Sequence, residues 1–263
     1  MALTLDHIVI AVHDLDKTID DYAALGFTVV RGGEHPGRPT HNALVVFEDG
    51  AYFELIAWRS PAPQDRWWQL LDQHGEGIID FALLPTSTAE VIIAAKARGL
   101  ELQGPLDGGR LRPDGEKLQW QTGRPHTHDL PFLCGDITPR KLRVPEGEVR
   151  QHANGATGVA RLTVAVSDLL QSLERYRALL GDGAHIHAAD GGSSATIALG
   201  NSVLELTQTA PQLQSKGEGP FVIALKGGTG SWDQAAAKLA HGAAIAFEKT
   251  EPASKANSSL ATA

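Results

Sequence analysis

The feature that most constrains this fold is an order of predicted elements that occurs three times along the chain. Residues 5–58 predict a β-branched strand, a helix capped by Asp14 and ended by Gly26, and three further strands, the last two of which flank a Glu-Asp-Gly turn. The same β-α-β-β-β order returns over residues 78–136 and again from residue 159, where VARLTVAVSDL echoes LDHIVIAVHDL. Repeats of one supersecondary unit indicate that the core forms where copies of that unit pack together.

A fourth copy starts but is incomplete. Residues 221–226 predict a strand, 232–240 a helix and 243–247 a second strand, and nothing after residue 249 predicts the last two strands. Because an open sheet edge invites pairing, we expect the C-terminal tail or a second subunit, in a homodimer, to cover it. The repeats divide the chain into a paired-module domain (1–140), a linker rich in Pro and Gly (141–156), a second, incomplete paired-module domain (157–250) and a flexible tail (251–263).

Composition excludes several classes of partner. The 263 residues carry a net charge of −8, which argues against binding to nucleic acid or an anionic membrane surface, yet it leaves room for a local basic pocket. The single cysteine, Cys134, cannot form an intramolecular disulfide. The N-terminal residues lack a basic, apolar leader, and no apolar run approaches the ~20 residues that span a bilayer. We therefore expect a cytoplasmic protein with a small-molecule partner and without nucleic-acid or membrane partners.

Three stretches carry a family resemblance: THNALVVFEDGAYFELIA (40–57), RLRPDGEKLQW (110–120) and LPFLCGDITPR (130–140). With the histidine in the first strand, they resemble the glyoxalase-like branch of the vicinal-oxygen-chelate superfamily. The resemblance implies an α+β fold, in which βαβββ modules pair into cup-shaped, curved mixed sheets with helices outside. It also implies a divalent metal (Zn, Mn, Fe, Co or Ni) in the cup, on ligands from the first and fourth strands of each module.

Carried onto this sequence, the resemblance gives His7, Glu54 and Asp80 as the metal ligands and Glu54 as the catalytic residue. Strand alternation places His7 and Glu54 on faces that can converge, and imidazole plus carboxylate suits these metals. Asp80 stands where a second histidine or a glutamine is usual, and the last strand of the second module lacks a carboxylate. His41, His126 and His128 are therefore alternative third ligands.

Other polar side chains near the expected cup are candidate substrate contacts. They are His41, Arg112, Gln119 and Gln121. Simpler interpretations stand beside the metal site: His7 can merely bond to Glu54, and Arg112 can be the partner that a buried Glu54 requires. His35, within EHPGRP, is interpreted as a loop residue and Cys134 as core filler. In the third module Arg161 replaces the histidine, and we expect it to pair with Glu205.

Two functions from different classes follow. The first is a small-molecule metalloenzyme, a lyase or isomerase or a dioxygenase, acting on a substrate with vicinal oxygens. The second is a metal-free binding protein of the bleomycin-resistance type that uses the same cup, and the weak ligand replacement in the second module favours it. A third interpretation is an interaction protein with a vestigial cup. Fold alone does not fix function. Metal content separates the first function from the second, because only the metalloenzyme requires a bound metal.

Overall fold

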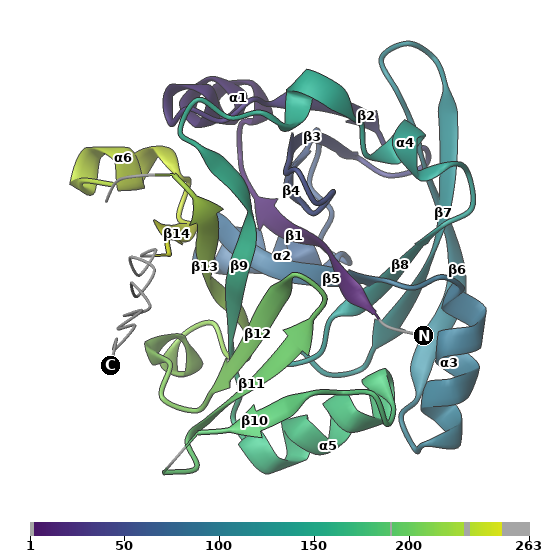
Figure 1. Ribbon diagram of the computed structural model, residues 1–263. Helices are drawn as coiled ribbons and strands as arrows, with labels where there is room; N and C mark the ends of the chain where they lie inside the picture. Colours follow the sequence, from purple (N-terminus) through teal and green to yellow (C-terminus); the bar gives the residue numbers. More distant parts are fainter. Residues whose placement is uncertain (1–2, 190, 229–231, 249–263) are drawn as a thin grey trace, which may run out of the picture.

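The computed structural model describes residues 3–189, 191–228 and 232–248. Within them the chain forms two curved sheets that lie side by side, with the barrel-forming strands in the N-terminal half (Figure 1). This is the α+β arrangement of paired modules and curved mixed sheets that the sequence predicts. No helix in these ranges is both long and apolar enough to cross a lipid bilayer.

The first sheet is a closed eight-stranded barrel in the order β1-β4-β3-β2-β6-β7-β8-β5. Its strands are β1 (Thr4–Ala11), β2 (Val30–Glu34), β3 (Thr40–Val46), β4 (Tyr52–Trp58), β5 (Gly77–Leu84), β6 (Leu102–Leu111), β7 (Lys117–Pro125) and β8 (Phe132–Asp136). Strand β1 runs parallel to β4 and antiparallel to β5, so the two modules join along their first strands, with His7 opposite Ala82. The expected pairing of two modules within one curved sheet is confirmed.

The second sheet has the order β10-β11-β12-β9-β13-β14. Its strands are β9 (Ala156–Ala165), β10 (Ile186–Ala188), β11 (Ser194–Leu199), β12 (Ser202–Thr207), β13 (Gly219–Gly227) and β14 (Ala244–Phe247). The fourth module accordingly supplies two strands, and β14 is the last strand at one edge. The tail expected to cover that edge (251–263) lies outside the described residues, so the covered edge and the homodimer stay predictions.

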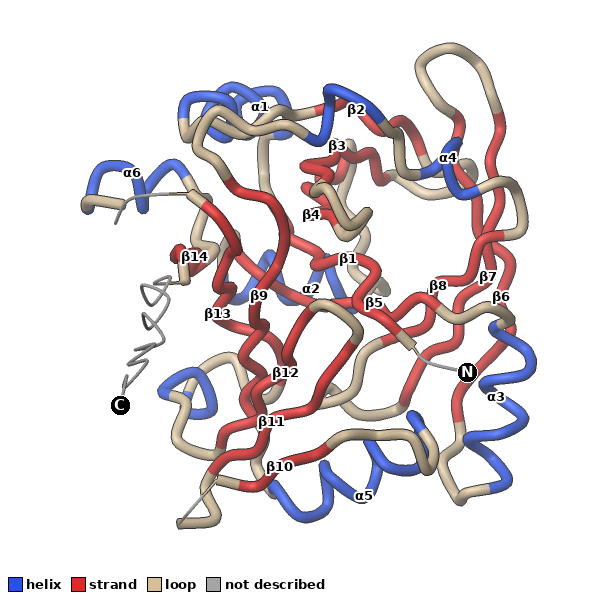
Figure 2. Tube along the Cα trace, viewed as in Figure 1, coloured by secondary structure: helices blue, strands red, loops and turns tan. Residues whose placement is uncertain are grey.

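Among the described residues, six α-helices accompany the sheets (Figure 2). They are α1 (Leu15–Ala24), α2 (Arg66–His74), α3 (Thr88–Ala97), α4 (Arg140–Arg143), α5 (Leu169–Leu180) and α6 (Gln234–Leu239), with short 3₁₀ turns η1 (Gly147–Arg150) and η2 (Pro211–Gln214). As predicted, the Asp14 side chain caps α1 by accepting from the backbone N–H of Lys17 at 3.0 Å. Helix α2 was not predicted. It begins behind an Asp65 cap and turns Trp67 toward the barrel interior.

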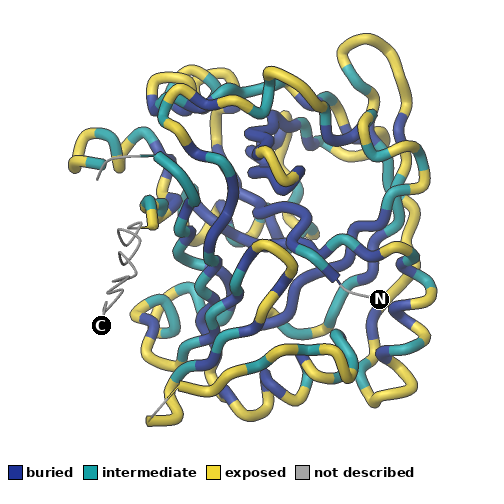
Figure 3. Tube along the Cα trace, viewed as in Figure 1, coloured by how far each residue is buried: buried dark blue, intermediate teal, exposed yellow. Residues whose placement is uncertain are grey.

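The two sheets share one hydrophobic core, and the most buried segments gather where they meet (Figure 3). Tyr22 of α1 donates to the backbone oxygen of Ala240 at 3.2 Å, although the two residues are 218 positions apart in the sequence. The segment 141–156 also packs closely: the ring of His152 accepts from Thr28 N–H at 3.0 Å and donates to Val46 O at 3.1 Å. These contacts bind the segment between the two sheets to the barrel rather than leaving it free.

Candidate functional site

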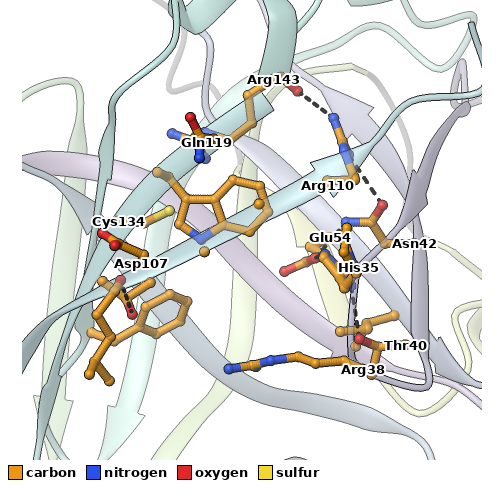
Figure 4. Close-up of a pocket in the computed structure, with 18 of the residues that line it drawn as sticks. His35, Arg38, Thr40, Asn42, Glu54, Asp107, Arg110, Gln119, Cys134 and Arg143 are labelled. Carbon is orange, nitrogen blue, oxygen red and sulfur yellow. Dashed lines mark hydrogen bonds and ion pairs between the residues drawn. The ribbon is translucent and has the colours of Figure 1, made fainter. Parts of the chain in front are cut away.

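A cavity of about 280 Å³ opens inside the barrel (Figure 4). It exists because residues of one parity on each strand point inward. On β1 this face carries His7 and on β4 it carries Tyr52, Glu54 and Ile56, as strand alternation predicts. The β2–β3 turn and the start of α2 also contribute to the lining, so polar groups and aromatic rings share one space. Such a cavity is the usual place for a small-molecule site.

His7 and Glu54 converge in this cavity. The Nε2 atom of His7 lies 3.5 Å from Oε2 of Glu54, and the imidazole stacks on Tyr52 with ring centroids 4.7 Å apart. On its other side, Nδ1 of His7 lies 2.7 Å from a carboxylate oxygen of Asp6. Because that carboxylate accepts the Nδ1 proton, it is the Nε2 atom that is directed at Glu54 and the cavity. The carboxylate thus fixes the tautomer and the orientation of His7.

Asp6 is ionised in the barrel wall despite complete burial. Burial alone would raise the pKa of Asp6, but Arg143, the bond from His7 and Arg140 together hold it well below its usual range. Nη1 of Arg143 donates to Asp6 at 2.7 Å, and Arg140 lies at the same distance from the other oxygen. Arg143 also binds Asp136 through Nε at 2.5 Å. A buried carboxylate with this many donors is a fixed negative charge behind His7.

Glu54 is oriented by an amide rather than by a cation. Nδ2 of Asn42 donates to Oε1 of Glu54 at 2.6 Å, and Nη1 of Arg110 donates to Oδ1 of Asn42 at 3.2 Å. A Cβ atom added at Gly32 would overlap both Asn42 and Arg110, so this close approach requires glycine there. Oε2 of Glu54 accepts no hydrogen bond from the described residues. It is therefore the atom that can bind a ligand or take a proton.

His35 completes the group around Glu54, although the sequence indicated only a loop residue. It lies in the turn between β2 and β3, where it is buried with 9 % of its surface exposed. Its Nδ1 lies 2.8 Å from Oγ1 of Thr40, and its Nε2 lies 3.8 Å from Oε1 of Glu54 (Figure 4). Burial lowers the pKa of His35, partly offset by Glu54. The ring is thus neutral at pH 7 and available as a ligand. Strand periodicity could not have revealed it, because a Gly- and Pro-rich turn has no fixed alternation.

Asp80 does not reach this group. Its Oδ2 accepts from Nη1 of Arg66 at 3.0 Å and from Nε1 of Trp67 at 2.8 Å, and it does not line the cavity. The expected ligand therefore has another role, joining α2 to the barrel. The alternative ligands His126 and His128 are exposed in the loop after β7. The second module supplies none of its expected ligands at this point.

The predicted substrate contacts divide into two groups. Gln119 lines the cavity. His41 alternates with two inward residues of β3, so it faces away from the cavity, and Gln121 donates to Asp107 at 3.0 Å. Arg112 pairs with Asp114 at 2.9 Å and so is not the partner of Glu54. Arg110, two residues earlier on β6, lines the cavity instead.

A tight cluster of ligand-type atoms lies at the wall of the cavity. Among the described residues, ligand atoms of Asp6, His7 and Cys134 lie within 4.8 Å of one another. Two arginines already occupy Asp6, and burial raises the pKa of Cys134 to about 12, so its sulfur is a neutral thiol. A divalent cation prefers a thiolate and an unpaired carboxylate. His7 with Glu54 is therefore the better pair of donors, and Asp6 acts by orienting His7.

The raised pKa of Cys134 gives a direct test of the cavity wall. At pH 8 the native protein should react with a thiol reagent such as DTNB at least about a hundredfold more slowly than an exposed cysteine, whose pKa is about 8.5. Unfolding in guanidinium should restore the full rate, because Cys134 is the only cysteine. Rapid labelling of the native protein would contradict the burial of this thiol.

In the second half of the chain the corresponding positions hold a charge pair. Nη1 of Arg161 on β9 lies 3.5 Å from Oε2 of Glu205 on β12, which confirms the predicted pairing. Arg161 also lies 3.6 Å from Glu248. Both side chains are about one-third exposed, so the pair contributes little to stability. It does show that the two halves share one backbone plan with different side-chain chemistry.

Several solved structures share this fold. A hypothetical protein from Staphylococcus aureus matches with a TM-score of 0.72 and 16% identity, covering 94% of this chain and 99% of that one. A mutant of 4-hydroxymandelate synthase from Streptomyces coelicolor matches with a TM-score of 0.55 and 14% identity, covering 91% and 75%. A xylose isomerase-like TIM barrel/4-hydroxyphenylpyruvate dioxygenase fusion protein gives 0.54 and 14%, covering 91% and 38%.

At these identities the structural matches establish the fold alone. A search of curated protein sequences finds no match. A family model described as a glyoxalase-like domain matches residues 5–180, about two-thirds of the chain. With the closed barrel of paired βαβββ modules, this match shows that the chain belongs to the glyoxalase-like domain family of the vicinal-oxygen-chelate superfamily.

Proposed function

We propose that this protein is a divalent-metal-dependent enzyme that acts on a small molecule inside the barrel, with His7, Glu54 and His35 as the metal ligands. One observation carries the proposal: the Nε2 atom of His7 faces a buried carboxylate oxygen of Glu54 at 3.5 Å, while Nδ1 of the same ring is bonded to Asp6. With the proton of a neutral ring on Nδ1, the two facing atoms are both acceptors. Two acceptors in that arrangement repel each other unless a cation or a proton lies between them.

The distances fit a shared cation. Two atoms that each bind one ion at about 2.1 Å lie roughly 3.0–3.5 Å apart at octahedral or tetrahedral angles. His7 and Glu54 meet this condition. His35 lies 3.8 Å from the other oxygen of Glu54, and ligand atoms of these three residues do not all lie within 4.8 Å of one another, so His35 has to move inward to complete the set. The His35 turn contains Pro36 and Gly37, and the ring bonds to Thr40, so the shift involves one short segment. Two histidines and one carboxylate leave positions for substrate oxygens.

The surrounding residues have definite tasks in this proposal. Asp6 keeps the proton of His7 on Nδ1, which leaves Nε2 free, and Asn42 holds one oxygen of Glu54 so that the other faces the cavity. When bound, a divalent cation supplies Lewis-acid polarisation of adjacent substrate oxygens. Oε2 of Glu54 faces both the proposed cation and the cavity, so it would have to leave the cation to accept a proton from a carbon next to a polarised carbonyl, which is its proposed catalytic role in lyase or isomerase chemistry.

Metal preference separates the two reaction classes within the proposal. Non-haem Fe(II) oxygenases use two histidines and one carboxylate, so selective binding of Fe(II) supports a dioxygenase. Preference for Zn, Mn, Co or Ni supports lyase or isomerase chemistry with Glu54 as base.

The charges around the ligands favour a second candidate function, metal-free binding of a small molecule. Two guanidinium groups, Arg110 and Arg143, lie in the cavity wall, and Arg110 has no carboxylate within 4.0 Å among the described residues. Positive charge in the wall of the cavity opposes the binding of a divalent cation there and attracts an anion. Metal content decides: protein that takes up none of the five metals is a binding protein rather than a metalloenzyme.

The proposed ligand set differs from the one that the strands alone predict, because it includes His35 from a turn. His35→Gln should weaken the affinity for the preferred metal about tenfold to a hundredfold, because it removes one neutral imidazole donor. His41→Gln is the matched control: it makes the same change on the neighbouring strand, outside the cavity. Isothermal titration of chelator-treated protein with Zn, Mn, Fe, Co and Ni measures both. Equal affinities in the two variants would remove His35 from the ligand set.

A further inference from the structure

We infer that the cavity binds small organic anions carrying a planar apolar group, with the anion held by Arg124 and the ring lying among the aromatic side chains of the barrel. The inference deepens the proposed function, because it names the substrate class of the same cavity. It rests on four observations: an unpaired guanidinium, an orphaned buried donor, the balance of charge in the wall, and the arrangement of aromatic rings.

Arg124 is the unpaired guanidinium. It lies on the inward face of β7 and lines the cavity, with its Cζ 5.4 Å from the ring of Trp67 and 5.7 Å from that of Phe132. Among the described residues no carboxylate approaches it within 4.0 Å and no hydrogen bond satisfies it. The nearest acids, Asp65 and Asp80, are engaged in capping α2 and in binding Arg66 and Trp67. A guanidinium that lies against two aromatic rings with its donors free is a ready site for a carboxylate.

Arg110 supplies the orphaned donor. Only 3 % of its surface is exposed, and Nη1 and Nη2 donate to Asn42 and to the backbone oxygen of Arg143. Its Nε–H is buried and has no partner among the described residues. Burial lowers the pKa of both Arg110 and Arg124, so each charge is poorly compensated within the protein. A buried donor without an acceptor leaves the positive charge of Arg110 poorly compensated, which favours an anion in the cavity that this residue lines.

The charge of the cavity wall is opposite to that of the molecule. The cationic lining residues are Arg38, Arg110, Lys117, Arg124 and Arg143, and the acidic ones are Glu54, Asp65 and Asp107. Asp6 and Asp136 neutralise Arg143, and Asp107 accepts from Gln121. A cationic cavity in a chain of net charge −8 concentrates anions at one place on a surface that otherwise repels them.

Aromatic rings set the shape of the ligand. Phe132 touches Arg124 on one side and, edge-on, the ring of His7 at 5.3 Å on the other. An anion bound to Arg124 therefore lies one ring away from the proposed ligands, with Trp67 and Trp120 also in the wall. The volume of about 280 Å³ lies just below the usual range for ligand pockets of about 300–1,000 Å³. It suits a single ring with a short acidic side chain.

Three probes separate the parts of this inference: phenylacetate, its neutral isostere phenylacetamide, and acetate, which lacks the ring. Wild-type protein should bind phenylacetate at least about tenfold more tightly than either of the others, because a charge-assisted bond and ring burial both contribute. Titration calorimetry and quenching of tryptophan fluorescence measure the affinities. Equal affinity for phenylacetate and phenylacetamide, or no binding of phenylacetate at millimolar concentration, would overturn the inference.

Variants locate the anion. Arg124→Gln should lower the affinity for phenylacetate about tenfold or more and leave that for phenylacetamide unchanged. Arg112→Gln is the matched control, since it removes the same charge from the turn of the same β6–β7 hairpin, outside the cavity. Equal effects of the two substitutions would place the anion elsewhere and overturn the role of Arg124. The comparison of probes on the wild-type protein needs no variant, so it stands even where Arg124→Gln fails to fold.

The two proposals fail separately. Phenylacetate binding by chelator-treated protein that takes up no metal would support the anion site and refute the metalloenzyme. Tight metal binding by a protein that ignores phenylacetate would do the reverse. Glu54→Gln gives a further separation: it should remove metal binding while leaving phenylacetate bound to the metal-free protein.

Discussion

Glu54→Gln is expected to reduce the affinity for a divalent metal by about a hundredfold or more while leaving the fold intact. The change removes one anionic donor and keeps the size and the bond to Asn42. Residues that merely support a ligand contribute tenfold to a hundredfold to metal affinity, so loss of a charged ligand should cost at least as much. Titration calorimetry and elemental analysis of the loaded protein measure the effect, and circular dichroism checks the fold.

Glu205→Gln is the natural control for this experiment. Glu205 occupies the same place in the second half of the chain, but Arg161 stands where His7 stands in the first half. We expect metal affinity equal to that of the wild type. If Glu54→Gln binds metal as tightly as Glu205→Gln, the metal site at Glu54 does not exist and the metal-free binding function takes its place.

Arg143→Met should have the largest effect on stability, a loss of roughly 3–5 kcal/mol in the free energy of unfolding at pH 7. The buried guanidinium binds Asp6, Asp136 and the hydroxyl of Tyr52, and its removal leaves the Asp6 charge compensated only by Arg140 and His7. Urea denaturation of the two proteins measures the difference. Arg140→Met, which removes a more exposed cation from the same carboxylates, should cost clearly less.

The difference in stability between wild type and Arg143→Met should depend on pH in a defined direction. The pKa of Asp6 is held well below its usual range in the folded protein, against the effect of burial, mainly by Arg143. Its contribution is therefore fully present above the unfolded-state pKa of about 3.9 and is lost as pH falls toward the folded value. The stability gap between wild type and Arg143→Met should narrow below about pH 4. A gap that widens on acidification would contradict the assignment of the charge to Asp6.

The sequence predicted the parts of the site that depend on strand periodicity. Alternation along two strands was enough to bring His7 and Glu54 together, because a regular strand fixes the face of every residue. The repeat predicted the pair of Arg161 and Glu205 for the same reason. Both results follow from backbone geometry alone and need no knowledge of side-chain partners.

The other parts of the site could not be predicted, because they depend on which side chains meet in three dimensions, and no local sequence pattern indicates this. Asp80 lies on the first strand of the second module as predicted, yet it binds Arg66 and Trp67 and does not line the cavity, because a helix that was not predicted brings two donors to it. His35 enters the cavity from a turn, where φ and ψ are not periodic. Arg143 was placed in a linker, since four helical residues give too short a pattern to recognise.

The position of Arg143 in the chain also determines where the molecule can be divided. The barrel strands end at Asp136, but the cation that balances the carboxylate in the barrel wall comes seven residues later. Beyond it, His152 bridges the backbones of Thr28 and Val46. A barrel cut after residue 140 would carry an acid with part of its counter-charge missing, whereas one that runs through residue 155 keeps these contacts. Recombination between relatives should therefore preserve the barrel when the crossover falls immediately before β9, and damage it when the crossover follows β8.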